Sequence, residues 1–194
     1  MALVSRFLFP RFRRFLLYTG GMNEAIFQHF GENETLSGVT DVFLIATLLF
    51  FMVYGVIGLV QLIRRKSLKK VDAELLAMIP STILIAVIYV IFEKLIVINT
   101  RPISDEPSFP STHTLVVTTI FLMAMQTLPR YVKNRKTRIA LYVAMSLVIV
   151  VVAAGRVISG MHWFTDVLGG LAFAAVLAVV YKIVLKKMKG QNNE

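Results

Sequence analysis

The stretch EKLIVINTRPISDEPSFPSTH, residues 93–113, separates two hydrophobic runs, and the organisation of the chain follows from it. It holds two cationic side chains, Lys94 and Arg101, and it ends in a proline–hydroxyl run before His113. Proline followed by hydroxyl residues is typical of the start of a helix. We therefore expect His113 in the first turn of a helix, with a polar loop before it.

Composition indicates an integral membrane protein. The chain of 194 residues is 57% hydrophobic and has a mean hydropathy of +0.73, whereas soluble domains are about 45–50% apolar. No polar stretch reaches the roughly 50 residues that a separate domain needs. The sequence has no cysteine, which excludes disulfides, thiolate metal sites and thiol catalysis.

The basic residues lie in short clusters between the apolar runs, although the net charge is +10. Nucleic-acid binding would gather them on one face with interleaved aromatic residues, so we expect no nucleic-acid partner. The clusters are residues 64–70, residues 129–138 and the C-terminal tail. By the positive-inside rule these segments are cytoplasmic. The 99–112 loop and the 155–163 turn then face the extracytoplasmic side.

We predict an all-α fold, an integral membrane helical bundle of five transmembrane helices. About 20 apolar residues at 1.5 Å rise cross the roughly 30 Å hydrocarbon core. Pro80 is expected to kink the second helix. The predicted spans are residues 42–63, 75–98, 113–128, 139–154 and 164–185.

The N-terminal segment is expected to lie along the membrane surface as an amphipathic helix. Its four arginines, Arg6, Arg11, Arg13 and Arg14, would each cost about 2.5–3.5 kcal/mol near the bilayer centre. The predicted division is residues 1–40 as this interfacial segment, 41–188 as the transmembrane bundle and 189–194 as a flexible polar tail. An odd number of spans places the N-terminus outside, and the alternative is a sixth crossing within residues 15–30.

Ionisable residues gather at the predicted outer ends of the helices. In lipid such groups face the bundle interior, so they should meet there. They are Lys94, Arg101, Arg156, His113, His162 and Asp166. Singly, each cation has an alternative interpretation as a basic anchor at a helix end, and each histidine as an interfacial residue.

The spacing within this set favours phosphate chemistry. His162 and Asp166 are four residues apart, so a helix puts both on one face. The aspartate can then accept the ring N–H and leave the other nitrogen free to attack. Arginines suit bidentate contact with a phosphoryl group. A helix that starts in the PSTH run, residues 110–113, offers backbone N–H groups to phosphate oxygens.

The same spacing resembles the tripartite signature of the type 2 phosphatidic acid phosphatase superfamily, KxxxxxxRP, PSGH and SRxxxxxHxxxD. Lys94 and Arg101 with the following proline match the first part, residues 110–113 match the second, and residues 156–166 match the third. With the surrounding helices the resemblance covers residues 42–185. It implies a helical bundle and a metal-independent membrane phosphatase with a phosphohistidine intermediate.

The resemblance also implies a role for each matched residue. His162 would be the nucleophile, Asp166 its orienting partner, and His113 the general acid that later activates water. No metal and no other cofactor is expected. The phosphate-binding residues would be Lys94, Arg101, Arg156, Ser111 and Thr112.

Two positions depart from the superfamily pattern. Thr112 stands where the signature has glycine, so the backbone loses freedom in φ and gains a side chain beside the phosphate. Gly155 stands where the signature has serine, which removes a hydroxyl. These departures bear on rate and substrate fit more than on the class of reaction.

A site at the outer ends of membrane helices suggests an amphiphilic phosphate ester or diphosphate, taken from the bilayer. Bacterial members of this size resemble phosphatases for undecaprenyl diphosphate, phosphatidylglycerophosphate or phosphatidic acid. The stretch MNEAIF, residues 22–27, resembles the bacitracin-resistance type. We predict conversion of undecaprenyl diphosphate to undecaprenyl phosphate at the outer face of the plasma membrane, with the two glycerophospholipids as alternatives.

Three other classes of protein would account for part of the pattern. A metal enzyme would use His113, His162 and a carboxylate as ligands, but the three cations favour an anion over a dication. A membrane transporter or scaffold explains the spans but not the histidine–aspartate spacing. The haloperoxidase branch of the superfamily resembles larger soluble proteins, and the lipid spans argue against it. The sequence does not predict the oligomeric state.

Overall fold

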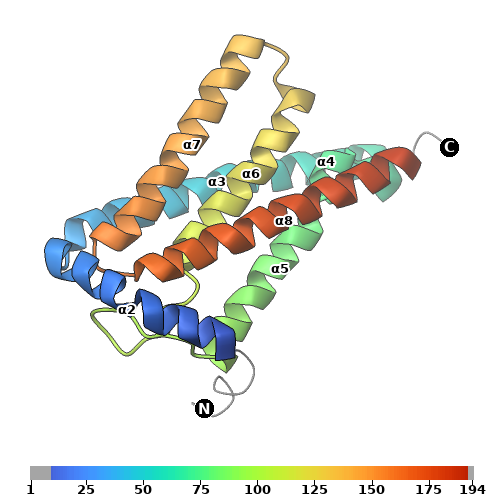
Figure 1. Cartoon of the computed structure of the whole chain (residues 1–194). Helices are drawn as coiled ribbons and strands as arrows, with labels where there is room; N and C mark the ends of the chain where they lie inside the picture. Colours follow the sequence, from blue (N-terminus) through green and yellow to red (C-terminus); the bar gives the residue numbers. More distant parts are fainter. Residues whose placement is uncertain (1–9, 192–194) are drawn as a thin grey trace.

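The computed structural model of the chain describes residues 10–191, with side chains for residues 19–190. The described part is all-α, apart from an isolated bridge between Thr100 and Pro107. Residues 1–9 of the predicted interfacial segment and residues 192–194 of the predicted tail lie outside it. The helices are α2 Pro10–Phe30, α3 Glu34–Arg65, the 3₁₀ helix η1 Leu68–Lys70, α4 Ala73–Leu76, α5 Met78–Val90, the π-helix η2 Ile91–Leu95, α6 Thr112–Tyr131, α7 Arg135–Ile158 and α8 Phe164–Gln191 (Figure 1).

Four helical segments of the described chain are long and apolar enough to cross a membrane. They correspond to the predicted first, second, fourth and fifth spans: Glu34–Arg65, Ala73–Leu95, Arg135–Ile158 and Phe164–Gly190. The chain is therefore an all-helical membrane protein. The count of five or six crossings stays a prediction.

Helix α6, the predicted third span, lies at the centre and packs against α3, α5, α7 and α8. It is less apolar than its neighbours because it buries four threonines, Thr114, Thr118, Thr119 and Thr127. Its 20 residues extend about 30 Å at 1.5 Å per residue, which matches the hydrocarbon core. Length and central position agree with a fifth crossing, while low hydropathy follows from contact with protein instead of lipid.

The helix that contains the predicted first span begins before it. The Asn33 side chain accepts a hydrogen bond from the Leu36 amide at 2.9 Å and caps α3, so residue 42, the predicted start of the span, lies inside the helix. The predicted boundary between residues 40 and 41 also falls within α3. Gly31, with φ of +68°, turns the chain between α2 and α3.

The second span is broken as Pro80 predicts. Proline has no amide hydrogen and its ring clashes with the carbonyl four residues earlier, here that of Leu76. The helix accordingly changes from α4 to α5 at Ala77. At the other end the chain winds into η2, a π-helical turn that contains Lys94; such turns are frequent at functional sites.

The three basic segments meet at one end of the bundle. Oδ1 of Asp72 lies 3.3 Å from Nη1 of Arg65 and 3.2 Å from Nη2 of Arg130. Oε1 of Glu74 lies 2.9 Å from Nζ of Lys189. Because α6 begins beside His113 and ends beside Arg130, this basic end is opposite the histidines.

Helix α2 lies across the histidine end of the bundle, where α7 ends and α8 begins (Figure 1). The Asn23 amide donates to the Thr165 hydroxyl at 2.9 Å and its oxygen accepts from the Thr165 backbone at 3.3 Å. The Phe27 ring stands edge-on to Trp163 at 5.9 Å. These contacts fix the turn that carries His162, while the interfacial, amphipathic character of this segment stays a prediction.

Gly169 and Gly170 let the loop before α6 pack closely on α8. A Cβ atom on Gly169 would lie 2.3 Å from the Phe109 ring, and one on Gly170 would lie 2.9 Å from the Ser111 carbonyl oxygen. Glycine at these two positions therefore permits the close approach of the loop to α8.

Candidate active site

The two stretches singled out in the sequence meet in space. The Ser111 amide donates to the Asp166 carbonyl at 3.0 Å, and the Trp163 indole N–H donates to the Thr100 carbonyl at 2.7 Å. The loop also folds back on itself, because the Ser108 amide donates to the Asn99 carbonyl at 2.9 Å. The predicted contact between residues 93–113 and the turn before α8 is therefore confirmed.

His162 is buried in this turn, with its side chain 3% exposed. Its Nδ1 atom lies 3.0 Å from the main-chain oxygen of Ser108. A carbonyl oxygen only accepts hydrogen bonds, so Nδ1 carries the hydrogen and Nε2 keeps its lone pair. The ring is thus held in the tautomer that a nucleophile at Nε2 requires.

Asp166 lies near His162, but the predicted shared helix face is wrong because α8 begins only at Phe164, and Asp166 does not bond the ring directly. Its Oδ2 atom is 3.9 Å from Nδ1, which is beyond hydrogen-bond distance. This oxygen accepts from the Trp163 amide at 3.0 Å and from the Ser108 hydroxyl. The expected direct hydrogen bond is replaced because the folded loop inserts Ser108 between the two residues.

Ser108 was not found by sequence reasoning. Its hydroxyl lies 3.3 Å from Nδ1 of His162 and the residue is 2% exposed. It stands outside the three signature parts, and only the fold of the loop brings it to the site.

The surroundings of His162 favour its neutral form. Burial is the largest cause that lowers its pKa below the usual 6.5, and the positive charges of Arg156 and Arg101 act in the same direction. The Asp166 carboxylate opposes them. The neutral imidazole is the form that can attack phosphorus.

His113 and Arg156 share one partner, Asp41 of α3. Oδ1 of Asp41 accepts from Nε2 of His113 at 2.8 Å and from Nη1 of Arg156 at 3.1 Å. The same Nη1 donates to the hydroxyls of Ser37 at 3.3 Å and Thr40 at 3.1 Å. Sequence reasoning placed none of these three α3 residues in the site.

Both arginines retain a donor for an incoming anion. The Nε atoms of Arg101 and Arg156 are buried and have no hydrogen-bond partner among residues 19–190, whose side chains the structure describes. Glu106 lies 3.5 Å from Nε of Arg101, which is too long for a good N–H···O bond. Two arginines with buried, unused Nε–H groups suit the oxygens of a phosphate.

Three further residues were predicted to bind phosphate, and the structure places them as follows. Lys94 is exposed and makes no hydrogen bond or ion pair with the part of the chain that the structure describes, so its role stays a prediction. Ser111 is fully buried at the start of α6, with its hydroxyl 3.1 Å from that of Thr114. Thr112, half-buried, opens α6 at the edge of an apolar cavity of about 270 Å³.

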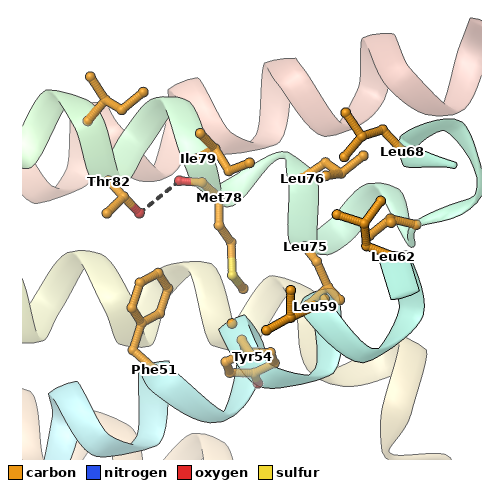
Figure 2. Close-up of a pocket in the computed structure, with 14 residues that line it drawn as sticks. Phe51, Tyr54, Leu59, Leu62, Leu68, Leu75, Leu76, Met78, Ile79 and Thr82 are labelled. Atoms are coloured by element: carbon orange, nitrogen blue, oxygen red, sulfur yellow. Dashed lines mark hydrogen bonds between the residues drawn. The ribbon is translucent and has the colours of Figure 1, made fainter. Parts of the chain in front are cut away.

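An apolar cavity lies away from the candidate active site. A cavity of about 430 Å³ between α3 and the η1–α5 segment is lined by apolar side chains such as Phe51, Leu75 and Met78 (Figure 2). No histidine, acid or base lines it. Within the described residues, no group of three or more histidine, aspartate or glutamate side chains is arranged to hold a metal.

Comparison with known proteins places this site in a family. The model of the PAP2 superfamily matches residues 91–189, about half of the chain, and the match contains all six signature residues. The chain belongs to the PAP2 superfamily. This is the family that the tripartite signature predicted.

The PAP2 fold extends beyond the matched residues. A solved structure described as the crystal structure of the first transmembrane PAP2 type phosphatidylglycerolphosphate phosphatase from Bacillus subtilis is similar to this chain, with a TM-score of 0.63 and 20% identity. The alignment covers 95% of this chain and 96% of that one. Such identity shows the fold alone, and the fold includes α2 and α3. No curated protein matched the chain.

Proposed function

We propose that this PAP2 protein is a lipid phosphatase that works through a phosphohistidine on His162. The observation that carries the proposal is the hydrogen bond from Nδ1 of His162 to the Ser108 carbonyl, which leaves the Nε2 lone pair free. Arg101 and Arg156, each with an unused buried N–H, flank the nucleophile. A nucleophile and anion-binding donors in one site are what phosphoryl transfer needs.

In the first step Nε2 of His162 attacks phosphorus, and the bond from phosphorus to the leaving oxygen breaks. His113 donates a proton to that oxygen, so the lipid leaves as a neutral alcohol or a protonated phosphate. Arg101 and Arg156 stabilise the charge on the non-bridging oxygens. The product is a phosphohistidine.

In the second step water attacks the phosphohistidine. His113, now neutral, accepts a proton from the water as the phosphorus–nitrogen bond breaks and its electron pair returns to Nε2. Inorganic phosphate leaves, and both histidines regain their starting states. No redox change and no metal ion enters the balance.

Two apolar cavities that border the site support a substrate from the bilayer. One, of about 270 Å³, is lined by residues of α3, α5 and α6 and reaches Thr112. The other, of about 340 Å³, lies between η2 and α8 and reaches Phe109, which follows Ser108. An amphiphile can place its phosphate among the histidines and an apolar tail in either cavity.

The orientation of the site supports an extracytoplasmic reaction at the plasma membrane. Three basic segments meet at the end of the bundle opposite the histidines, and such segments stay in the cytoplasm. Undecaprenyl diphosphate, a lipid used on the outer side, is therefore our first candidate substrate. Phosphatidylglycerophosphate is the second, because the solved structure with the same fold is described as a phosphatase for that lipid.

The experiment is phosphate release by purified wild-type and His162→Ala protein in detergent with EDTA. The substrates are undecaprenyl diphosphate, phosphatidylglycerophosphate and phosphatidic acid. We expect release by the wild type alone, with the rates ranking the lipids. An active His162→Ala protein would contradict the covalent mechanism. No release by a folded wild type would favour the transporter or scaffold alternative.

A further inference from the structure

An acidic residue outside the part of the chain matched by the family model touches two proposed catalytic groups. Oδ1 of Asp41 accepts hydrogen bonds from Nε2 of His113 and from Nη1 of Arg156. Asp41 lies on α3, whereas the match begins at residue 91. None of the signature residues supplies a partner for His113.

Gly155 explains why α3 comes close enough to do this. A Cβ atom at this position would lie 2.6 Å from the Cγ2 atom of Thr40, closer than packed carbon atoms can approach. The superfamily signature has serine here. With glycine, α3 packs against α7, and three of its side chains, those of Ser37, Thr40 and Asp41, reach Arg156.

The contact has a direct chemical consequence for His113. A carboxylate that accepts the Nε2 hydrogen fixes the ring orientation and leaves Nδ1 to carry the proton that is transferred. The charged and titratable groups near His113 are Asp41 on α3, Arg156 on α7 and His162 before α8. Asp41 is the negative one, so it offsets the repulsion between a protonated His113 and the guanidinium of Arg156.

A purely structural ion pair is the competing interpretation, and exposure argues against it. The Asp41 side chain is 52% exposed while that of Arg156 is 3% exposed, and solvent weakens an ion pair that is open to water on one side. Arg156 also keeps the Ser37 and Thr40 hydroxyls as partners without Asp41.

We propose that Asp41 is a positioning residue that holds His113 as the proton donor to the leaving group. This inference rests on the proposed phosphatase function. Asp41 would orient His113, much as Ser108 and Asp166 orient His162. It also gives the glycine at position 155 a reason, because only a close α3 delivers the carboxylate.

The test compares Asp41→Asn with the wild type on two esters, in detergent with EDTA. Phosphatidic acid has an alkyl leaving oxygen that needs a proton, whereas a nitrophenyl phosphate with an alkyl chain has a leaving oxygen that departs without one. We expect kcat/KM of Asp41→Asn to fall about 100-fold for phosphatidic acid, the usual size of general acid catalysis. For the nitrophenyl ester we expect a loss of less than about tenfold.

Three control variants separate positioning from general damage. His113→Ala should show the same selective loss, because it removes the proton donor itself. The Ser37 hydroxyl contacts Arg156 and not His113, so Ser37→Ala should lower kcat/KM for both esters by the same factor. Asp41→Glu keeps the carboxylate and should recover part of the activity toward phosphatidic acid.

The outcomes distinguish this inference from the proposed function. Equal losses for both esters in a folded Asp41→Asn protein, or no loss, would overturn the inference alone. Release of phosphate by the wild type from neither ester and also not from undecaprenyl diphosphate or phosphatidylglycerophosphate would overturn the proposed function, and the inference with it.

Discussion

The hydroxyl of Ser108 donates a hydrogen bond to the carboxylate of Asp166. The same residue accepts the Nδ1 hydrogen of His162 through its main-chain oxygen at 3.0 Å. The connection between carboxylate and histidine therefore passes through the loop before α6. A change in that loop is expected to act on the nucleophile even where it leaves both signature residues in place.

Ser108→Ala removes the hydroxyl and keeps the main-chain oxygen. We expect kcat to fall about tenfold, equivalent to about 1.4 kcal/mol, because one hydrogen bond to a buried carboxylate is lost while the histidine tautomer is retained. Phosphate release measures this. The control is Ser104→Ala, an exposed serine in the same loop, which should be unaffected. A loss as large as that of His162→Ala would show that the hydroxyl, not the carbonyl, holds the ring.

The pH profile should show an acid limb below pH 6.5. Burial, together with Arg156 and Arg101, lowers the pKa of His162 from 6.5, so the neutral nucleophile persists to lower pH than an exposed histidine would. Activity is lost only as the pH falls through this lowered pKa. The measurement is kcat/KM of the wild type from pH 4 to 8. A midpoint at or above pH 6.5 would contradict the expectation.

Asp166→Asn supplies the matched comparison, since the ionisation of the substrate is the same in both proteins. The carboxylate favours the protonated ring, so its removal should move the acid limb to still lower pH while reducing kcat less than His162→Ala does. An upward shift would mean that Asp166 does not influence His162 in the expected way.

Sequence reasoning found the transmembrane helices where apolar runs are long and uninterrupted. It began the first span at residue 42, where the apolar run starts, yet the helix already begins at Glu34. The cap at Asn33 and the contacts of Ser37 and Thr40 with Arg156 stabilise these first helical turns. The contacts with Arg156 join residues far apart in the chain, so hydropathy alone does not reveal them.

Sequence reasoning likewise found only part of the candidate site. The spacing of the histidines, Asp166 and the arginines identified them as a set, but His162 precedes α8, so the turn before that helix, and not a shared helix face, places it near Asp166. Spacing does not identify Ser108 and Asp41, because a folded loop and a neighbouring helix bring them in. Lys94 shows the reverse case, a residue with the right spacing that is exposed and makes no hydrogen bond or ion pair with the described part of the chain.

Gly155→Ala tests whether the close packing of α3 on α7 supports the site. The added methyl would stand 2.6 Å from Cγ2 of Thr40, so we expect a loss of about 1–3 kcal/mol in stability from overpacking and a lower kcat as Asp41 shifts. Thermal unfolding and phosphate release measure the two effects.

Thr40→Ser offers the rescue, because it removes Cγ2 and keeps the hydroxyl that bonds Arg156. The double variant should recover most of the stability and activity lost in Gly155→Ala, a coupling that a double-mutant cycle detects. Additive losses would show that the contact with Thr40 is not the cause.

Asn23→Ala tests the role of α2. Asn23 is 6% exposed and makes both of its hydrogen bonds to Thr165, which lies between His162 and Asp166 in the chain. We expect a loss of about 1–3 kcal/mol in stability, because a buried hydroxyl and a buried amide lose their partner, and a reduced kcat. Gln28→Ala, at an exposed amide on the same helix, is the control. Unchanged kcat in Asn23→Ala would mean that α2 does not position the turn.

Ala86→Trp tests whether the cavity that reaches Thr112 accepts the lipid tail. Ala86 lines this cavity of about 270 Å³ from α5, and a tryptophan there would fill it. We expect kcat/KM for a long-chain lipid phosphate to fall about tenfold, the equivalent of roughly two methylene groups at about 0.8 kcal/mol each. A soluble short-chain phosphate, which has no tail to place, should be hydrolysed as by the wild type. Val87 lies on the same helix and does not line the cavity, so Val87→Trp is the control for placing a bulky side chain on this helix. If Ala86→Trp slowed both substrates equally, the tail would have to lie elsewhere, and the cavity beside Phe109 between η2 and α8 would be the next to test.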